Sequence, residues 1–264
     1  NSDWLNWNTS WWRGNYPSLN NIKWRYALWD LDNTFNHGAN YTGIVDQSFE
    51  SNICDLDTLG DIGGQGHIPI WNKLLLNNNF FESYINRFSY LNDTYLSCDF
   101  LLNHLDSLIN IIEPEMPAQI LKWGGNIETW NQNVQELVNF ISNRCNNIND
   151  NILNCYDSQL SNYHNLIIIS NIDNNGEIYL NNNHILNLPS LNTCFENINQ
   201  NIEIIPNLNF DIDSIFFINN TPISNNASSF NFELLFDDTL IINFKPVNSV
   251  NINMIPNDVG TISF

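Results

Sequence analysis

The chain has 264 residues, a formal net charge of -20 with only eight lysines and arginines, and a hydrophobic share of 43%. This length and composition indicate a folded protein of one large or two modest domains. The acidity excludes nucleic acid and anionic membranes as partners, because both are bound through basic patches. The sequence contains no run of about 18 apolar residues, so no membrane-spanning segment is predicted.

Residues 1–45 contain one predicted strand, residues 24–29, which ends at a carboxylate pair in the sequence DLDNT. If the strand continues to Asp32, the side chains of Asp30 and Asp32 lie on one face, roughly 6 to 7 Å apart. At that spacing their oxygens can hold a hard cation. A solvated strand end, or a turn capped by the two side chains, is an equally good interpretation of the pair alone.

DLDNT also matches the nucleophile motif of haloacid-dehalogenase-like phosphatases, in which the first Asp attacks phosphorus and the second acts as the acid. That family has a doubly wound sheet, whereas a Gly- and Asn-rich loop and a helical block follow the motif here. The only later acidic couple, Asp237 and Asp238, falls in a β-rich segment. A phosphatase is therefore the less favoured alternative.

Between residues 66 and 153 apolar residues recur at spacings of three and four, which predicts a block of helices. The helical segments are residues 68–78, 79–96, 98–112 and 129–145. The sequence EPEMP, with Glu113 and Glu115, is expected to be an acidic helix boundary because its prolines break a helix.

After Tyr156 short β-branched and aromatic runs alternate with Asn, Gly, Pro and Asp, which predicts a β-sandwich module of roughly 85 residues. The clearest runs are residues 165–170, 176–180, 214–218 and 240–245. A weak repeat relates the sequence around Gly176 to that around Gly260. A second module, cut short at the end of the chain, is therefore expected from residue 248.

The five cysteines are too few and too scattered for a disulfide framework, and no CxxC pair indicates zinc. They are Cys54, Cys98, Cys145, Cys155 and Cys194. We expect buried or free thiols. A bridge between Cys145 and Cys155 is the alternative for an exported protein.

Several other residues have both a structural and a functional interpretation. His67 in GGQGHIPI is expected to start a helix or to form loop hydrogen bonds rather than to act in a site. Arg13 and Arg25 can clamp a phosphate or pair with surplus carboxylates. The N-terminal tryptophans are expected to pack in a core rather than to form a sugar-binding platform; they are Trp4, Trp7, Trp11, Trp12, Trp24 and Trp29.

The sequence NSDWLNWN places Asn8 five positions after Asp3, which is the D-x4-N spacing of a protein-kinase catalytic loop. In such a loop the Asp orients the acceptor hydroxyl and the Asn binds metal. A later Asp at the end of a strand, here Asp30, would be the second metal ligand.

Five blocks of sequence together resemble the CotH spore-coat kinase family, in the secreted bacterial form that carries appended β-modules. In chain order they are NSDWLNWNTSWWRG, KWRYALWDLDNTFNHG, GGQGHIPIWNKLLLNNNFFESYINRFSYLNDTYL, HLDSLINIIEPEMPAQILKW and FISNRC. Members of this family are similar to protein kinases of atypical sequence. The resemblance implies that residues 1–155 form the C-terminal part of the kinase domain, with the helical block as its C-terminal lobe.

On that resemblance Asp3 is the catalytic Asp and Asp30 the metal-binding Asp, while Asn8 and Asp32 are further metal ligands. The family's nucleotide-binding lobe lies upstream of the catalytic Asp, and this chain also lacks a glycine-rich phosphate loop. We therefore expect a fragment that binds ATP poorly by itself. ATP with Mg²⁺ or Mn²⁺ is implied, because a nucleotide approaches so acidic a protein only together with a cation.

The predicted fold class is α+β, a mainly helical kinase-like C-terminal lobe (residues 1–155) followed by an all-β sandwich module (156–247) and the truncated start of another (248–264). The favoured hypothesis is transfer of the ATP γ-phosphoryl group to Ser or Thr of proteins on the cell surface or in the extracellular matrix. The protein itself is expected to be secreted or displayed on a bacterial surface. The alternative is a non-catalytic surface or adhesion protein with a kinase-like fold that binds partners through its β-modules or aromatic residues.

Overall fold

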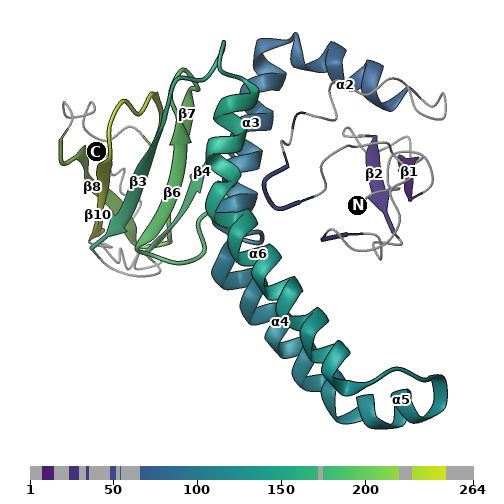
Figure 1. Cartoon of the computed structure of the whole chain (residues 1–264). Coiled ribbons are helices and arrows are strands. Elements are labelled where there is room, and N and C mark those ends of the chain that lie inside the picture. The colour runs from purple at the N-terminus through teal and green to yellow at the C-terminus, as the bar shows by residue number, and fades with distance from the viewer. Residues whose placement is uncertain are drawn as a thin grey trace, which may run out of the picture. The chain divides into compact units, whose positions relative to one another are not determined.

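The structure of the protein is a computed structural model with an α+β fold (Figure 1). It describes residues 8–14, 24–29, 34–35, 48–51, 54, 66–171, 175–219 and 228–247. Asp3, Asp30, Asp32 and the second β-module predicted from residue 248 lie outside these ranges. The chain divides into two compact units. The first comprises Asn1–His164, Asn192–Asn199 and Glu233–Phe236, and the second comprises Asn165–Leu191, Gln200–Phe232 and Asp237–Phe264.

The first unit contains a two-stranded antiparallel sheet of β1 (Thr9–Trp12) and β2 (Arg25–Leu28), in which Trp11 pairs with Tyr26. β2 was predicted from the sequence, whereas β1 was not. The four residues of β1, TSWW, do not alternate between polar and apolar, so they carry no period-two signal. Their extended conformation depends on pairing with β2.

The helical block of the first unit follows. Its elements are α2 (His67–Leu75), α3 (Asn78–Asp93), α4 (Cys98–Ile112), the 3-10 helix η2 (Glu113–Glu115), α5 (Met116–Trp123) and α6 (Ile127–Cys155). The prediction for α4 was confirmed residue by residue. Asparagine side chains cap two of the helices: Asn77 accepts a hydrogen bond from the amide of Phe80 at 3.1 Å, and Asn126 from that of Thr129 at 2.6 Å.

The segment EPEMP is a boundary, as expected, but helix continues beyond it. Proline is tolerated in the first turn of a helix, where its missing N–H would have no partner. The two prolines therefore start η2 and α5. The chain reverses instead at Gly124 and Gly125, whose φ angles of 88° and 106° favour glycine.

The core of the first unit joins α3 to the C-terminal end of α6. Phe81 and Ile85 of α3 pack with Ile152 and Tyr156, and the Phe81 and Tyr156 rings meet edge to face with centroids 5.2 Å apart. Leu160, Phe195 and Ile198 complete this cluster. Ile152 is fully buried, which explains why α6 continues ten residues past the predicted end at Cys145 through an Asn-rich sequence of low helix propensity.

Two disulfides connect elements of the first unit. Cys98 of α4 is bonded to Cys145 of α6, and Cys54 is bonded to Cys155, with Cα atoms 5.5 and 5.6 Å apart. Figure 1 shows α4 and α6 side by side. The expectation of free thiols was wrong for these four residues, and so was the suggested bridge between Cys145 and Cys155. Both of those residues lie on α6, where ten residues span about 15 Å, too far for a disulfide.

The β-rich part contains two four-stranded sheets. Their strands are β3 (Tyr163–Ser170), β4 (Gly176–Leu180), β5 (Asn183–His184), β6 (Ser190–Phe195), β7 (Gln200–Pro206), β8 (Phe210–Phe217), β9 (Ser229–Phe232) and β10 (Asp238–Pro246). The orders are β6-β3-β10-β8 and β5-β4-β7-β9. β3 pairs with β10 in parallel.

Side chains from the two sheets meet within the second unit. The rings of Phe217 on β8 and Phe232 on β9 lie 5.0 Å apart. Gly176 on β4 faces Phe244 on β10 so closely that a Cβ atom at Gly176 would lie 2.6 Å from the ring. Alternate residues of β10 are buried, as expected for a strand with one face toward a core.

Candidate functional site

The β1–β2 pairing brings Asn8 beside the residue that precedes the DLD motif. The backbone amide of Trp29 donates a hydrogen bond to the carbonyl oxygen of Asn8 at 3.2 Å. This bond extends the ladder beyond the pair Thr9 and Leu28. Asn8 is a polar residue with only 4% of its surface exposed. Asn8 of the block NSDWLNWNTSWWRG is therefore paired with Trp29 of the block KWRYALWDLDNTFNHG at this end of the sheet.

Asn8 is the one predicted site residue within the described ranges. The assignments of Asp3, Asp30 and Asp32 remain predictions, because these three residues lie outside those ranges. Within the part of the chain that the structure describes, no group of three or more His, Cys, Asp and Glu side chains is placed to hold a metal ion. A cation at this end of the sheet would need carboxylates of the DLD motif.

His67 starts α2, as expected, and it packs on the same sheet. Its ring centroid lies 5.8 Å from that of Trp11 and 5.9 Å from that of Tyr26, which are themselves 4.7 Å apart. His67 is buried, and Gly66 before it adopts φ 79°. The cluster of these three rings ties the sheet to the helical block.

The tryptophans of the sheet are not core residues, so the prediction of core packing was wrong for those described. The exposed fractions of Trp12, Trp24 and Trp29 are 49%, 60% and 47%. A two-stranded ribbon has too little backbone to enclose large rings on both faces. Two of these rings have an arginine guanidinium over them instead: Arg13 lies 4.9 Å from the Trp24 centroid, and Arg25 lies 5.3 Å from that of Trp12.

The residues that follow the DLD motif contact α6 at three places. The rings of Phe35 and Phe140 meet edge to face, with centroids 5.8 Å apart. The Arg144 guanidinium donates to the carbonyl oxygens of Phe49, at 3.0 Å, and of Ser51. The third attachment is the disulfide from Cys54 to Cys155. Sequence reasoning missed all three, because no local pattern links residues so far apart in the chain.

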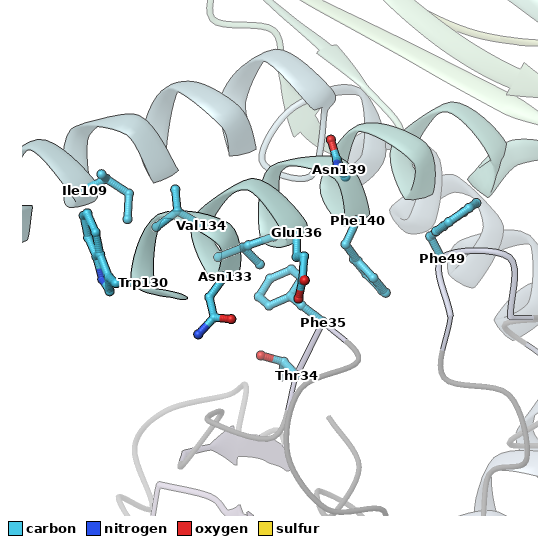
Figure 2. A pocket seen from close by; sticks show the side chains of 11 residues that line it. Thr34, Phe35, Phe49, Ile109, Trp130, Asn133, Val134, Glu136, Asn139 and Phe140 are labelled. Atoms are coloured by element: carbon cyan, nitrogen blue, oxygen red, sulfur yellow. The ribbon is translucent and has the colours of Figure 1, made fainter. Parts of the chain in front are cut away.

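Phe35 borders two hollows along α6. Figure 2 shows its side chain reaching toward the helix, beside Glu136 and Phe140. The larger hollow has a volume of about 600 Å³ and extends past Trp130 to Ile109 of α4. The smaller hollow, of about 170 Å³, is lined by apolar residues together with Arg144 and Cys145.

A polar cluster of Asp93 and Thr193 joins the C-terminal end of α3 to β6. The Asp93 carboxylate accepts hydrogen bonds from the backbone amide and the hydroxyl of Thr193. Burial raises the pKa of Asp93 to about 6, although the bonds from Thr193 oppose the shift. Burial also raises the pKa of the Cys194 thiol, so this buried cysteine is protonated and does not act as a nucleophile.

The late acidic couple of the phosphatase alternative has structural roles. The Asp237 carboxylate accepts a hydrogen bond from the Asn165 amide at 2.8 Å. The Asp238 carboxylate is buried at the start of β10 and accepts from the amides of Asn219 and Thr239 at 3.0 and 2.7 Å. These carboxylates hold loops onto strands.

Comparison with known proteins defines the class to which these features belong. A family model described as CotH kinase protein matches residues 1–148. The match covers more than half of the chain and includes the β1–β2 sheet, the DLD motif and most of the helical block. The chain therefore belongs to the CotH kinase family. No curated protein and no solved structure matches it. Among the described helices, none is long and apolar enough to cross a membrane.

Proposed function

We propose that this protein acts as a metal-dependent protein kinase that transfers the γ-phosphoryl group of ATP to Ser or Thr hydroxyls. The observation that carries the proposal is the hydrogen bond from the Trp29 amide to the Asn8 carbonyl. It pairs the backbone of Asn8 with that of Trp29, the residue that precedes Asp30 in the sequence, and so supports the proposal that Asn8 and the DLD carboxylates act together. Family membership supports a kinase over a phosphatase built on the same motif.

The residues fit a hard divalent cation. Asn8 supplies an amide oxygen and Asp30 and Asp32 supply carboxylates, which is the oxygen donor set that Mg²⁺ and Mn²⁺ prefer. Asn8 is buried at the end of the β1–β2 sheet, so contacts with the protein, and not with water, fix its position. When bound, the cation neutralises the charge that develops on the transferred phosphoryl group.

Asp3 completes the arrangement as the group that orients the acceptor hydroxyl and accepts its proton. Phosphoryl transfer depends mainly on positioning and charge neutralisation. Charge neutralisation matters especially here, because a protein with a formal charge of -20 repels a triphosphate that carries no cation. ATP with Mg²⁺ or Mn²⁺ is therefore the proposed cofactor set.

The remaining parts of the proposal concern architecture and location. The helical block would be the C-terminal lobe of an atypical kinase, and the two four-stranded sheets would form the β-sandwich module. Two disulfides are compatible with an oxidising, extracellular environment. We propose secretion or surface display, with proteins of the cell surface or extracellular matrix as phosphate acceptors.

The test is phosphate transfer by the full-length gene product, measured with γ-labelled ATP in Mg²⁺ or Mn²⁺. Asp3→Ala and Asp30→Ala should each lower transfer at least about 100-fold, because each removes a group required in the transition state. Asp157→Ala, at an exposed residue after α6, is the matched control and should leave transfer unchanged. Undiminished transfer in the first two variants would remove both residues from their roles.

The exposed tryptophans favour one second candidate, a non-catalytic surface protein that binds partners through its aromatic ribbon. Trp12 and Trp24 are exposed and each is stacked with an arginine. Such rings bind sugars and other flat surfaces. Two results together would support this candidate over the kinase. Trp24→Ala would lose binding to surface glycans or proteins, and binding by the wild-type protein would not depend on nucleotide.

A further inference from the structure

The helices α4 and α6 leave much of their apolar surface exposed toward the end of the pair that carries α5. No residue of α4, η2 or α5 is buried, and the buried residues of α6 begin only at Ile141. The two helices lie side by side and are joined by the bond between Cys98 and Cys145 (Figure 1). An apolar stripe on a helix is normally covered by another element. Within the described part of the chain, one face of this pair has no such cover.

The larger of the two hollows along α6 lies on this face. It is lined by Ile109 of α4, by Trp130 and Val134 of α6, and by Phe35. Figure 2 shows the first three side chains at one end of the hollow, with Phe35 further along α6. Its volume of about 600 Å³ is within the range of ligand-binding pockets.

One helical turn beyond the hollow, the apolar row continues on both helices. Ile112 lies three residues after Ile109, and Ile127 lies three residues before Trp130, which places each pair on one face of its helix. The exposed fractions of Ile112 and Ile127 are 46% and 37%. At a rise of 1.5 Å per residue, the row from Ile127 to Phe140 is about 20 Å long. A helix of about 14 residues has the same length.

The charge of this region distinguishes between possible occupants. Residues 98–143 contain six carboxylates, one lysine and no arginine. Glu136 is the charged side chain among the described residues that line the hollow, and it accepts a hydrogen bond from Gln132 at 3.0 Å. A second copy of the chain, with its formal charge of -20, would be repelled by this face, and so would an anionic lipid surface. An occupant with an apolar side and basic residues at its edges complements the face in both respects.

We propose that this face of α4 and α6 is a docking site for a basic amphipathic helix of a partner protein. The apolar side chains of that helix enter the hollow beside Trp130 and cover Ile112 and Ile127, as in other complexes where a helix binds in an apolar groove. Lysine or arginine at the edge of the helix pairs with Glu136. The site requires neither nucleotide nor metal, so it is independent of the proposed kinase activity.

The test uses a fluorescein-labelled peptide of about 18 leucine and lysine residues, with leucines at spacings of three and four. Fluorescence anisotropy with the whole chain, without nucleotide and at about 0.15 M salt, measures the affinity while salt screens non-specific attraction. An isomer of the same composition, with its leucines spread around the whole helix, has no apolar face. It should bind at least about tenfold more weakly, because contact with the apolar row carries most of the affinity.

Two variants test the face itself. Ile112→Glu and Trp130→Ala should each weaken binding of the first peptide at least about tenfold, because they remove apolar contacts. Ile205→Glu is the matched control: Ile205, on β7 in the other compact unit, is 45% exposed, and the substitution adds the same charge. It should leave the affinity unchanged. An added carboxylate attracts a basic peptide, so weaker binding by Ile112→Glu reports the loss of apolar contact. Thermal unfolding of each variant separates this loss from loss of the fold.

Several outcomes would overturn the proposal, whatever the phosphate-transfer assays give. Equal affinity for the two isomers, or unchanged affinity in either folded variant of the face, would exclude a docking site there. Equally tight binding of a leucine and glutamate peptide would exclude a basic partner. Sedimentation of the protein alone tests for a second copy, and flotation with phosphatidylcholine vesicles tests for lipid. Self-association or vesicle binding that Ile112→Glu abolishes would assign the face to that occupant instead.

Discussion

The Asp93 carboxylate, at the C-terminal end of α3, accepts two hydrogen bonds from Thr193 of β6, at 2.6 Å from the backbone amide and at 2.8 Å from the hydroxyl. A carboxylate in this place is disfavoured by burial and by the negative end of the helix dipole. The two hydrogen bonds from Thr193 stabilise the carboxylate at this buried position, and they join residues 100 positions apart in the chain.

The first prediction concerns the pH dependence of stability. The pKa of Asp93 is about 6 in the folded protein, above the ordinary value of 3.8, so the folded state binds more protons than the unfolded state between these values. The free energy of unfolding should therefore fall as pH rises from about 4 to 6, by up to about 3 kcal/mol from this residue. Urea unfolding at a series of pH values measures it.

Asp93→Asn is the decisive variant for that prediction. An amide can accept from the Thr193 N–H and donate to its hydroxyl, and it does not titrate. The variant should lose the decline between about pH 4 and 6, whereas Asp99→Asn, at an exposed position on α4, should keep it. An equal pH slope in Asp93→Asn and wild type would contradict the assignment.

The second prediction concerns the cysteines. Unreduced protein should expose one reactive thiol, Cys194, and only after denaturation, because Cys194 is 1% exposed and the other four cysteines are bonded. Thiol titration with and without reductant checks this. Replacing Cys98 and Cys145 by serine opens a loop of 47 residues and should lower the free energy of unfolding by about 4 kcal/mol. Two or more thiols in the denatured, unreduced protein would disprove the pairing.

The third prediction concerns Gly176 in the β-rich unit. A methyl group there would lie 2.6 Å from the Phe244 ring and 2.9 Å from the backbone oxygen of Ile205. The backbone oxygen cannot move aside, so Gly176→Ala should destabilise the protein by about 1 to 3 kcal/mol. Gly14→Ala is the control, since no atom lies within 4 Å of the position that its methyl group would take. Equal melting temperatures for the two variants would argue against the close approach of the sheets.

The fourth prediction concerns the start of α6. Asn126→Ala removes the acceptor for the Thr129 amide and should cost about 1 kcal/mol, whereas Asn126→Ser, which keeps a capping oxygen, should cost much less. Chemical denaturation of both variants measures the difference. A similar loss in the two variants would mean that the capping bond contributes little.

The fifth prediction concerns Asn8. Its backbone carbonyl holds Trp29, so Asn8→Ala keeps this backbone bond and removes the side-chain amide group with its oxygen. The Mn²⁺ concentration for half-maximal phosphate transfer should rise about tenfold. Ser10→Ala on β1, an exposed position, should leave it unchanged. A normal Mn²⁺ requirement in Asn8→Ala would exclude this side chain as a ligand.

Most of the helices and several strands could be predicted because their signals are local. The spacing of apolar residues in α4 and the alternation in β10 depend on residues a few positions apart, which the order of amino acids states directly. The CotH kinase family could also be recognised from the order of short sequence blocks, whereas the assignment of Asn8 and Asp30 as site residues stays a prediction.

The tertiary structure decided which distant residues meet. β1 becomes a strand only opposite β2, Cys54 finds Cys155 rather than a nearer cysteine, and the ribbon tryptophans remain exposed because nothing on so small a sheet encloses them. The contact of Phe35 with Phe140 belongs to the same group. Such choices depend on the path of the whole chain, since contacts between distant residues form only when the intervening elements have packed.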